Sequence, residues 1–188
     1  MMLSDDHKRS LLCMARQAIY RHLGPTILNK GPDIGTDDAG QIKCGVFVSL
    51  YVEGRLRGCI GTFSEANILT DNVKNMALSS STSDSRFSPI QPSELDSLKI
   101  ELSVLSPRKQ ISDKNEIILG RHGIYMEKDN RRGTFLPQVA TEQNWSIDEF
   151  LGNCARHKAK IGWNGWKEAK LYTYEAIVFS SDDFPEEN

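Results

Sequence analysis

The sequence lacks any apolar run near the roughly 18 residues that a membrane-spanning helix needs. Its first eight residues, Met1 to Lys8, are acidic and polar, whereas a signal peptide would begin basic and continue apolar. We therefore expect a cytoplasmic protein with no membrane partner.

Cysteine is scarce, and its four occurrences, Cys13, Cys44, Cys59 and Cys154, form no CxxC or CxxxCxxC pattern. Such spacing excludes a local zinc knuckle and the iron–sulfur loop of radical enzymes within this chain. We expect reduced thiols rather than disulfides, and neither a metal nor a cofactor.

An excess of positive charge is also missing, because 23 Lys and Arg face 25 Asp and Glu, giving a net charge of -2. No overall field therefore attracts phosphate backbones or acidic lipids, which argues against nucleic acid as a partner. The 188 residues, 39% of them hydrophobic and 26% charged, are instead typical of one ordinary globular domain.

Apolar periodicity predicts the main elements of this domain. Helical spacing predicts helices that begin after Ser4 and after Ser146, and a third from Ile68 that fades in the polar run Ser79 to Ser83. Alternating or apolar runs predict extended segments at Gly45–Val52, Arg55–Thr62, Lys99–Leu105, Ile117–Met126, Thr134–Leu136 and Leu171–Phe179. The segments Thr26–Lys43 and Asp84–Pro92 are expected to be irregular loops.

The mixture of hairpins and helices, without a strict strand-helix-strand repeat, favours an α+β fold with a mainly antiparallel sheet and flanking helices. No internal repeat and no linker separates two domains. We therefore expect a single domain over residues 1–180 and an acidic, disordered tail over residues 181–188.

The most unusual segment is Leu56-Arg57-Gly58-Cys59-Ile60-Gly61, which falls in the second strand of the predicted hairpin. In an extended chain Arg57 and Cys59 share one face, and a guanidinium close to a thiol favours the thiolate. Gly58 and Gly61 leave room for a ligand or another backbone. The alternative is structural, since cysteine is often buried and strand glycines often mark only a bulge.

Three other polar groups could contribute chemistry. Asp84 and Arg86 lie two apart in a loop, where such a pair either ties down a turn or touches substrate. Glu101 is on the polar face of a strand and, if that face is inward, needs a partner such as Arg57 or Arg86. His122 is either a general base or a hydrogen-bonding partner of the backbone.

Aromatic and basic residues also mix near the end of the last predicted helix. These residues are Lys158, Lys160, Trp163, Trp166 and Lys167. They either stack a nucleic-acid base or cover the end of the core, and nucleic-acid binding ranks last among the functional readings.

Taken together, these segments resemble the AMMECR-one domain family over nearly the whole chain. The resemblance rests on the hexapeptide Leu56–Gly61 and, in the same order along the chain, on Asp84–Phe87, Ile100–Leu105, Gly120–Gly123 and Leu136–Ala140. Two positions depart from the family pattern. Ser85 stands where Pro is usual, and Lys158-Ala159-Lys160-Ile161 stands where the family usually has Lys-Ala-Gly-Leu.

The resemblance implies an α+β fold with a larger and a smaller lobe, and the hexapeptide near a cleft between them. It also suggests component A of the AmmeMemoRadiSam system, with a Memo-like protein and a radical S-adenosylmethionine protein as partners. The family carries no assigned activity, so the resemblance does not identify a reaction.

Two hypotheses for function follow. In the first, Cys59 is a catalytic thiolate, Arg57 its charge partner, and Glu101 or His122 the proton-transfer group. In the second, the protein is a non-enzymatic adaptor that docks a peptide or a partner protein. The candidate residues for binding an unknown small molecule or peptide are Arg57, Gly58, Gly61, Asp84, Arg86 and Gln138.

Overall fold

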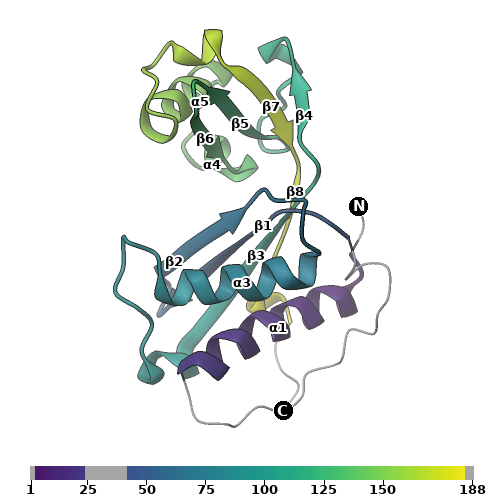
Figure 1. The fold of residues 1–188 in the computed structure, drawn as a ribbon, viewed down its shortest axis with the longest axis vertical. Helices are drawn as coiled ribbons and strands as arrows, with labels where there is room; N and C mark the ends of the chain where they lie inside the picture. Colours follow the sequence, from purple (N-terminus) through teal and green to yellow (C-terminus); the bar gives the residue numbers. More distant parts are fainter. Residues whose placement is uncertain (1–2, 24–41, 185–188) are drawn as a thin grey trace. The chain divides into compact units, whose positions relative to one another are not determined.

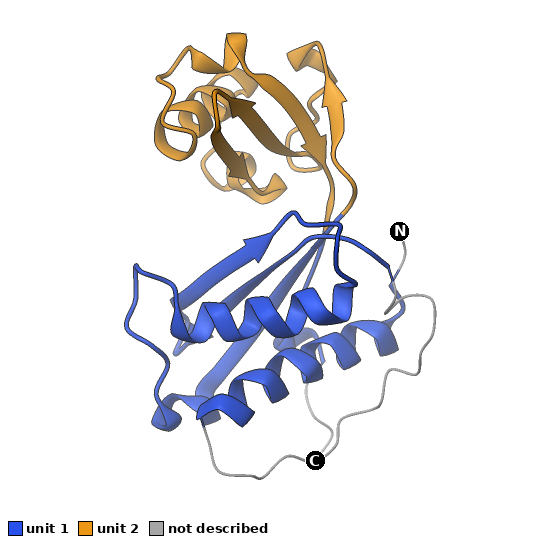
Figure 2. Ribbon diagram, in the orientation of Figure 1, with its two compact units in different colours: residues 1–105, 177–188 blue, residues 106–176 orange. Residues whose placement is uncertain are grey.

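The computed structural model describes residues 3–23 and 42–184 and confirms an α+β fold (Figure 1). The chain divides into two compact units (Figure 2). Unit 1 comprises residues 1–105 and 177–188, and unit 2 comprises residues 106–176. In the sequence, unit 2 therefore stands between the two segments that form unit 1.

Unit 1 is built on a four-stranded sheet with the strand order β2-β1-β3-β8. Its strands are β1 (Val46–Val52), β2 (Arg55–Thr62), β3 (Leu98–Leu105) and β8 (Ala176–Ser180), and β1 runs antiparallel to both β2 and β3. Helices α1 (Asp5–Leu23) and α3 (Leu69–Thr82) lie side by side over one face of this sheet (Figure 1). Because β2 comes first in the strand order, it is an edge strand of the sheet.

The predicted hairpin is confirmed and accounts for the register of the core. Glu53 and Gly54 both have positive φ, 50° and 75°, as a two-residue type I′ turn requires. Val46, Val48 and Leu50 then alternate into the core, where all three are fully buried with apolar residues of α1 and α3. The opposite face of β1 carries Phe47, Ser49 and Tyr51.

Helix α3 extends further than its sequence suggests. The polar run after Leu78, expected to fade, stays helical to Thr82 because its hydroxyls find partners. Ser80, which is buried, donates to the carbonyl of Val48 at 2.7 Å, and Ser81 donates to that of Leu78 at 2.9 Å. The serines are thus part of the packed interior.

The first helix begins as predicted, with the Ser4 hydroxyl accepting the His7 backbone N–H at 3.3 Å. Gly24 and Pro25, a pair that predicts the end of this helix, lie outside the described residues, as does most of the predicted loop Thr26–Lys43.

Unit 2 contains a second antiparallel sheet with the order β4-β7-β5-β6. Its strands are β4 (Lys109–Ile111), β5 (Gly123–Lys128), β6 (Arg131–Phe135) and β7 (Lys170–Tyr174), and its helices are α4 (Pro137–Glu142) and α5 (Ile147–Asn153). α5 begins with the predicted capping box of Ser146 and Glu149 and continues into a π-helical segment, η3 (Cys154–Lys158). Short 3-10 turns complete the fold: η1 (Pro92–Ser97), η2 (Lys114–Glu116), η4 (Gly165–Glu168) and η5 (Ser181–Asp183).

Two predicted strands need correction. The continuous strand Leu171–Phe179 is in fact β7 and β8, which end and begin on either side of Glu175 and join different sheets. Glu175 instead exchanges backbone contacts with Ser106, whose N–H donates to its carbonyl and whose hydroxyl accepts its N–H, both at 2.9 Å. The strand expected from Ile117 begins only at Gly123, because a turn closes first with Gly120 at φ 80°.

Helix α4 was not predicted, although Pro137 at its first turn is a common helix start. At the end of the chain, the first residues of the expected tail form η5, while residues 185–188 lie outside the described part. Among the residues that the structure describes, no helix has the length and apolar character to cross a membrane.

Candidate functional site

The hexapeptide occupies β2 and contains a β-bulge at Arg57. Leu50 pairs with Gly58 and Tyr51 pairs with Leu56, so Arg57 is the extra residue. Its guanidinium binds Glu94 through two nitrogens, at 2.7 and 3.1 Å, and the carbonyl of Ser88 at 3.3 Å. These bonds lower the pKa of Glu94 and raise that of Arg57. Arg57 is therefore the charge partner of Glu94, which corrects the expected pairing with Cys59.

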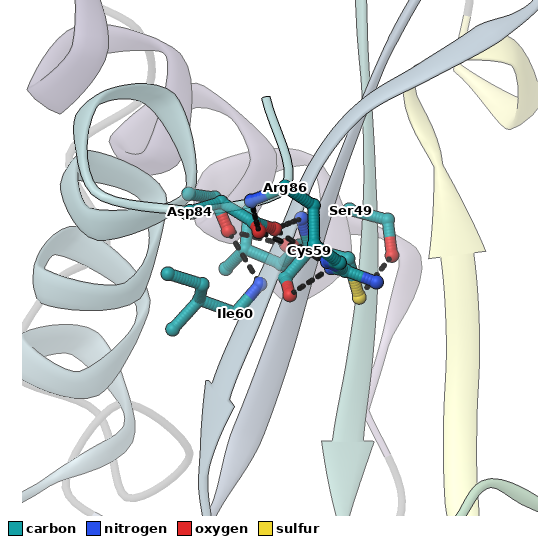
Figure 3. A network of polar contacts seen from close by, with 7 residues as sticks. Ser49, Cys59, Ile60, Asp84 and Arg86 are labelled. Atoms are coloured by element: carbon teal, nitrogen blue, oxygen red, sulfur yellow. Dashed lines mark hydrogen bonds and ion pairs between the residues drawn. The ribbon is translucent and has the colours of Figure 1, made fainter. Parts of the chain in front are cut away.

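The guanidinium that reaches Cys59 belongs to Arg86 (Figure 3). The Asp84 carboxylate accepts the Cys59 backbone N–H at 2.8 Å, and Arg86 donates to the Cys59 carbonyl at 3.0 Å. Arg86 and Asp84 also form a bidentate ion pair at 2.9 and 2.7 Å. Asp84 and Arg86 thus bind both backbone groups on the outer edge of β2 at Cys59, and so protect an edge that would otherwise be open.

The electrostatics of this ion pair follow from its burial. The Asp84 side chain is 6% exposed and the Arg86 side chain 53% exposed. The pKa of Asp84 lies far below its ordinary value, chiefly because Arg86 donates hydrogen bonds to the carboxylate, assisted by the backbone N–H groups of Cys59 and Arg86. Asp84 is therefore an anion under ordinary conditions, while Arg86 keeps part of its surface in solvent.

The glycines of the hexapeptide allow close packing. A Cβ on Gly58 would lie 2.1 Å from the carbonyl oxygen of Ser80, and one on Gly61 would lie 2.3 Å from the ring of Phe47. Ser80 also accepts the Ile60 backbone N–H at 2.7 Å. The end of α3 thus lies directly against β2, and another backbone occupies the space that Gly58 leaves.

The Cys59 thiol faces polar groups. Ser49 is 6% exposed, and its hydroxyl donates a hydrogen bond to the Cys59 sulfur at 3.4 Å. The Arg86 guanidinium, which donates to the Cys59 carbonyl at 3.0 Å, lies next to the thiol, as Figure 3 shows. The pKa of Arg86 is raised, first by Asp84 and to a smaller extent by Cys59. Cys59 itself is half-buried. The Ser49 hydroxyl and the Arg86 guanidinium therefore both lie next to the sulfur.

Glu101 lies on the same sheet, one strand further across. In the register of the sheet Ser49 is the partner of Cys59 on β2 and of Glu101 on β3. We call Cys59, Ser49 and Glu101 the thiol row. Ser49 points away from the face that α1 and α3 cover, since its neighbours Val48 and Leu50 are buried there.

His122 and Gln138 belong to unit 2. His122 accepts the Ile118 backbone N–H through Nδ1 at 3.2 Å, and its Nε2 lies 4.0 Å from a carboxylate oxygen of Glu175. It lines a cavity of about 240 Å³ within unit 2, together with Lys109, Thr173 and Tyr174. The Gln138 carbonyl accepts the Thr141 hydroxyl at 2.8 Å in the first turn of α4.

The structure therefore brings together most of the predicted site within unit 1, namely Arg57, Gly58, Cys59, Gly61, Asp84, Arg86 and Glu101. Sequence reasoning missed Ser49, Ser80 and Glu94. Ser49 could have been found as the one serine on the face of β1 opposite the core, but only with knowledge of the bulge that aligns it with Cys59.

Two other cysteines provide a contrast. Cys44 is buried in unit 1 and Cys154 is buried in unit 2. Burial raises the pKa of Cys44 to about 11 and that of Cys154 to about 12, so both remain neutral thiols near neutral pH. No group of three or more His, Cys, Asp or Glu side chains suited to a metal ion occurs in the described part of the chain.

Comparisons with known proteins agree with this fold. The family model described as AMMECR1 matches residues 12–179, and the chain belongs to this family. A protein of Methanothermobacter thermautotrophicus is 36% identical over 96% of this chain and 97% of its own length. A Methanopyrus kandleri protein is 37% identical over 92% of this chain and 87% of its own. The crystal structure of an uncharacterised protein from Pyrococcus horikoshii matches this fold with a TM-score of 0.82 and 33% sequence identity. The match covers 95% of this chain and 93% of the Pyrococcus horikoshii chain.

Proposed function

We propose that this protein acts through Cys59 as a nucleophile in a modification reaction, as a component of an AmmeMemoRadiSam-type system. The observation that carries the proposal is the position of the sulfur, half-buried and next to both the Ser49 hydroxyl and the Arg86 guanidinium. A guanidinium or a hydroxyl donor beside a thiol favours the thiolate in general, and the thiolate is the reactive form of cysteine. Membership of the AMMECR1 family supports the assignment to this system.

The covalent step is a substitution at an electrophilic carbon of the substrate. The sulfur electron pair forms an S–C bond while the bond from that carbon to its leaving group breaks, and the leaving group departs with the bonding pair. The proton lost from the thiol passes to the carboxylate of Glu101, which lies in the thiol row, or to solvent.

The alternative is an adaptor that docks a peptide or partner protein. The half-exposed side chain of Arg86 favours an adaptor, because its guanidinium can donate hydrogen bonds to an anionic group of a partner. Arg57 and Asp84 support it less, since Glu94 and Arg86 already occupy their hydrogen-bonding groups. The partners that we propose in either case are a Memo-like protein and a radical S-adenosylmethionine protein.

Thiol reactivity tests the nucleophile directly. Native protein is alkylated with iodoacetamide over a pH series, and the rate at each cysteine is read by peptide mass spectrometry. We expect Cys59 to react faster than Cys13, which is also partly exposed, and Ser49→Ala and Arg86→Gln to slow Cys59 alone. Equal rates at Cys59 and Cys13, with both small and bulky reagents, would show that Cys59 is not activated.

The Cys59→Ser variant separates the two functions. Replacing the thiol with a hydroxyl should abolish a reaction that depends on the Cys59 nucleophile. An adaptor should retain its partners, because serine is close to cysteine in size. Pull-down with purified Memo-like and radical S-adenosylmethionine proteins, together with complementation of a deletion strain, measures both properties. Complementation by Cys59→Ser would exclude the nucleophile, and its loss with binding intact would support it.

A further inference from the structure

Charge is divided unequally between the two units. Unit 2 contains twelve Lys and Arg against nine Asp and Glu, a formal charge of +3, whereas the rest of the chain has eleven against sixteen. The small net charge of the whole chain is therefore an average over a positive and a negative part. The net charge of the whole chain therefore does not exclude polyanion binding by unit 2.

Part of this positive charge gathers where β6 packs along η3. A Cβ on Gly133 of β6 would lie 2.6 Å from the backbone nitrogen of Ala159, so the two segments are in direct contact. Arg131 donates a hydrogen bond to the Lys160 carbonyl. The Lys158 ammonium lies 5.4 Å from the centre of the Phe135 ring. Arg132 is also exposed but is paired with Glu127; the other exposed cations on these segments are Arg131, Arg156, Lys158 and Lys160, which we call the basic surface.

These four cations differ from the five cations of unit 2 that form ion pairs with carboxylates. Ion pairs in this unit engage Lys109, Lys114, Arg121, Lys128 and Arg132. Within the described residues, no carboxylate forms an ion pair with any member of the basic surface. Their charge is available to an external anion.

Two further observations concern Lys160 and the nearby Trp163. Lys160 has a φ of 58°, a left-handed conformation in which a lysine is strained, and such strain concentrates at functional positions. Three residues later, the Trp163 ring packs against Gly152 and the residue remains 40% exposed. A partly exposed indole that follows Lys160 closely in the chain fits the combination of aromatic and basic residues that binds bases and phosphates of single strands.

We propose that the basic surface and Trp163 bind single-stranded nucleic acid, with Arg131, Arg156, Lys158 and Lys160 contacting phosphates and Trp163 stacking on a base. An acidic protein segment would use the same cations but would not need a flat aromatic face. The presence of Trp163 therefore favours the nucleic acid.

Fluorescence anisotropy with a labelled oligouridylate of about 12 nucleotides tests the proposal on the full chain. We expect affinity to fall with salt, by about 0.7 in log–log slope for each phosphate contacted. The triple variant Arg156→Glu, Lys158→Glu, Lys160→Glu should lose at least about tenfold in affinity. The charge-matched control changes three exposed cations of unit 1, Lys43→Glu, Arg55→Glu and Lys74→Glu, and should bind like the wild type.

Two single variants separate stacking from charge. Unlabelled oligouridylate should quench tryptophan fluorescence, and Trp163→Leu should abolish that quenching. Lys160→Gly should lower the salt slope while leaving the urea midpoint unchanged or higher, which a purely structural role for Lys160 would not do. Undetectable binding, equal loss in both triple variants, or equally tight binding of an oligoglutamate peptide would overturn the proposal, the last result indicating an acidic protein partner.

Discussion

The two units use ion pairs in different ways. In unit 1 the side chains of Arg57 and Glu94 are 20% and 21% exposed, and Asp84 is 6% exposed. In unit 2 the pairs lie at the surface, as with Lys109 and Glu116, which are 75% and 37% exposed. Partly buried, hydrogen-bonded pairs position backbone, whereas exposed pairs contribute little to stability. The charged groups of unit 1 therefore hold the hexapeptide in place, and those of unit 2 do not have that role.

The largest expected effect is at Gly58. Gly58→Ala places a Cβ 2.1 Å from the Ser80 carbonyl, so β2 and α3 must separate, at a cost of about 3 kcal/mol or more in the free energy of unfolding. Gly54→Ala is the matched control, because its Cβ meets nothing within 4 Å and only its φ of 75° is strained. It should cost about 1 kcal/mol.

Urea unfolding measures the change, and thiol labelling assigns it to a unit. Cys44 reports opening of unit 1, and Cys154 reports opening of unit 2. If Gly58→Ala exposes both thiols at the same urea concentration, the units unfold together and the contrast between them does not extend to stability.

Asp84→Asn comes next, with an expected loss of about 2 kcal/mol, because charge-assisted bonds to Arg86 and to the Cys59 N–H weaken. The pKa of Asp84 is lowered in the folded state, so its stabilisation is present above the unfolded pKa of about 3.9 and is lost as pH falls below it. Urea midpoints measured from pH 7 to pH 3 should fall more steeply in the wild type than in the variant. Parallel pH curves would contradict this role for Asp84.

A smaller effect, of opposite sign, is expected in unit 2. Lys160→Gly removes left-handed strain of about 1 to 2 kcal/mol but adds freedom to the unfolded chain, for a net gain of about 0.5 kcal/mol. Asn130→Gly is the control, because asparagine tolerates the left-handed region and its φ of 64° is little strained. A loss of stability in Lys160→Gly, measured by urea unfolding with Cys154 labelling, would show that the side chain itself stabilises unit 2.

The smallest effect should come from the surface pair of Lys128 and Glu168 in unit 2. The Glu168 side chain is 76% exposed, so solvent screens the attraction although the Lys128 side chain is 27% exposed, and a double-mutant cycle of Lys128→Ala and Glu168→Ala should show no measurable coupling in the urea midpoint. A measurable coupling would mean that the surface pairs of unit 2 also hold its fold.

Local patterns predicted much of the fold. The alternation of Val46, Val48 and Leu50, with Glu53 and Gly54 as the turn, specifies the hairpin, and Ser146 with Glu149 specifies the start of α5. Each of these signals lies within a few residues and depends on backbone geometry alone. The same local reasoning failed at Glu175, where the chain passes from one sheet to another without a change in its apolar pattern.

The sequence predicted many of the residues of the candidate site but not which of them contact one another. The sequence by itself determined that a cysteine stands between glycines on a strand, with Asp84, Arg86 and Glu101 available elsewhere in the chain. Only the tertiary structure decided that a bulge at Arg57 pairs Cys59 with Ser49, where an unbulged hairpin would have placed Gly58. It also decided that Arg86 approaches the thiol while Arg57 binds Glu94. Strand register and ion pairing between distant residues depend on how α3 and the following loop pack against β2, and no local pattern encodes that packing.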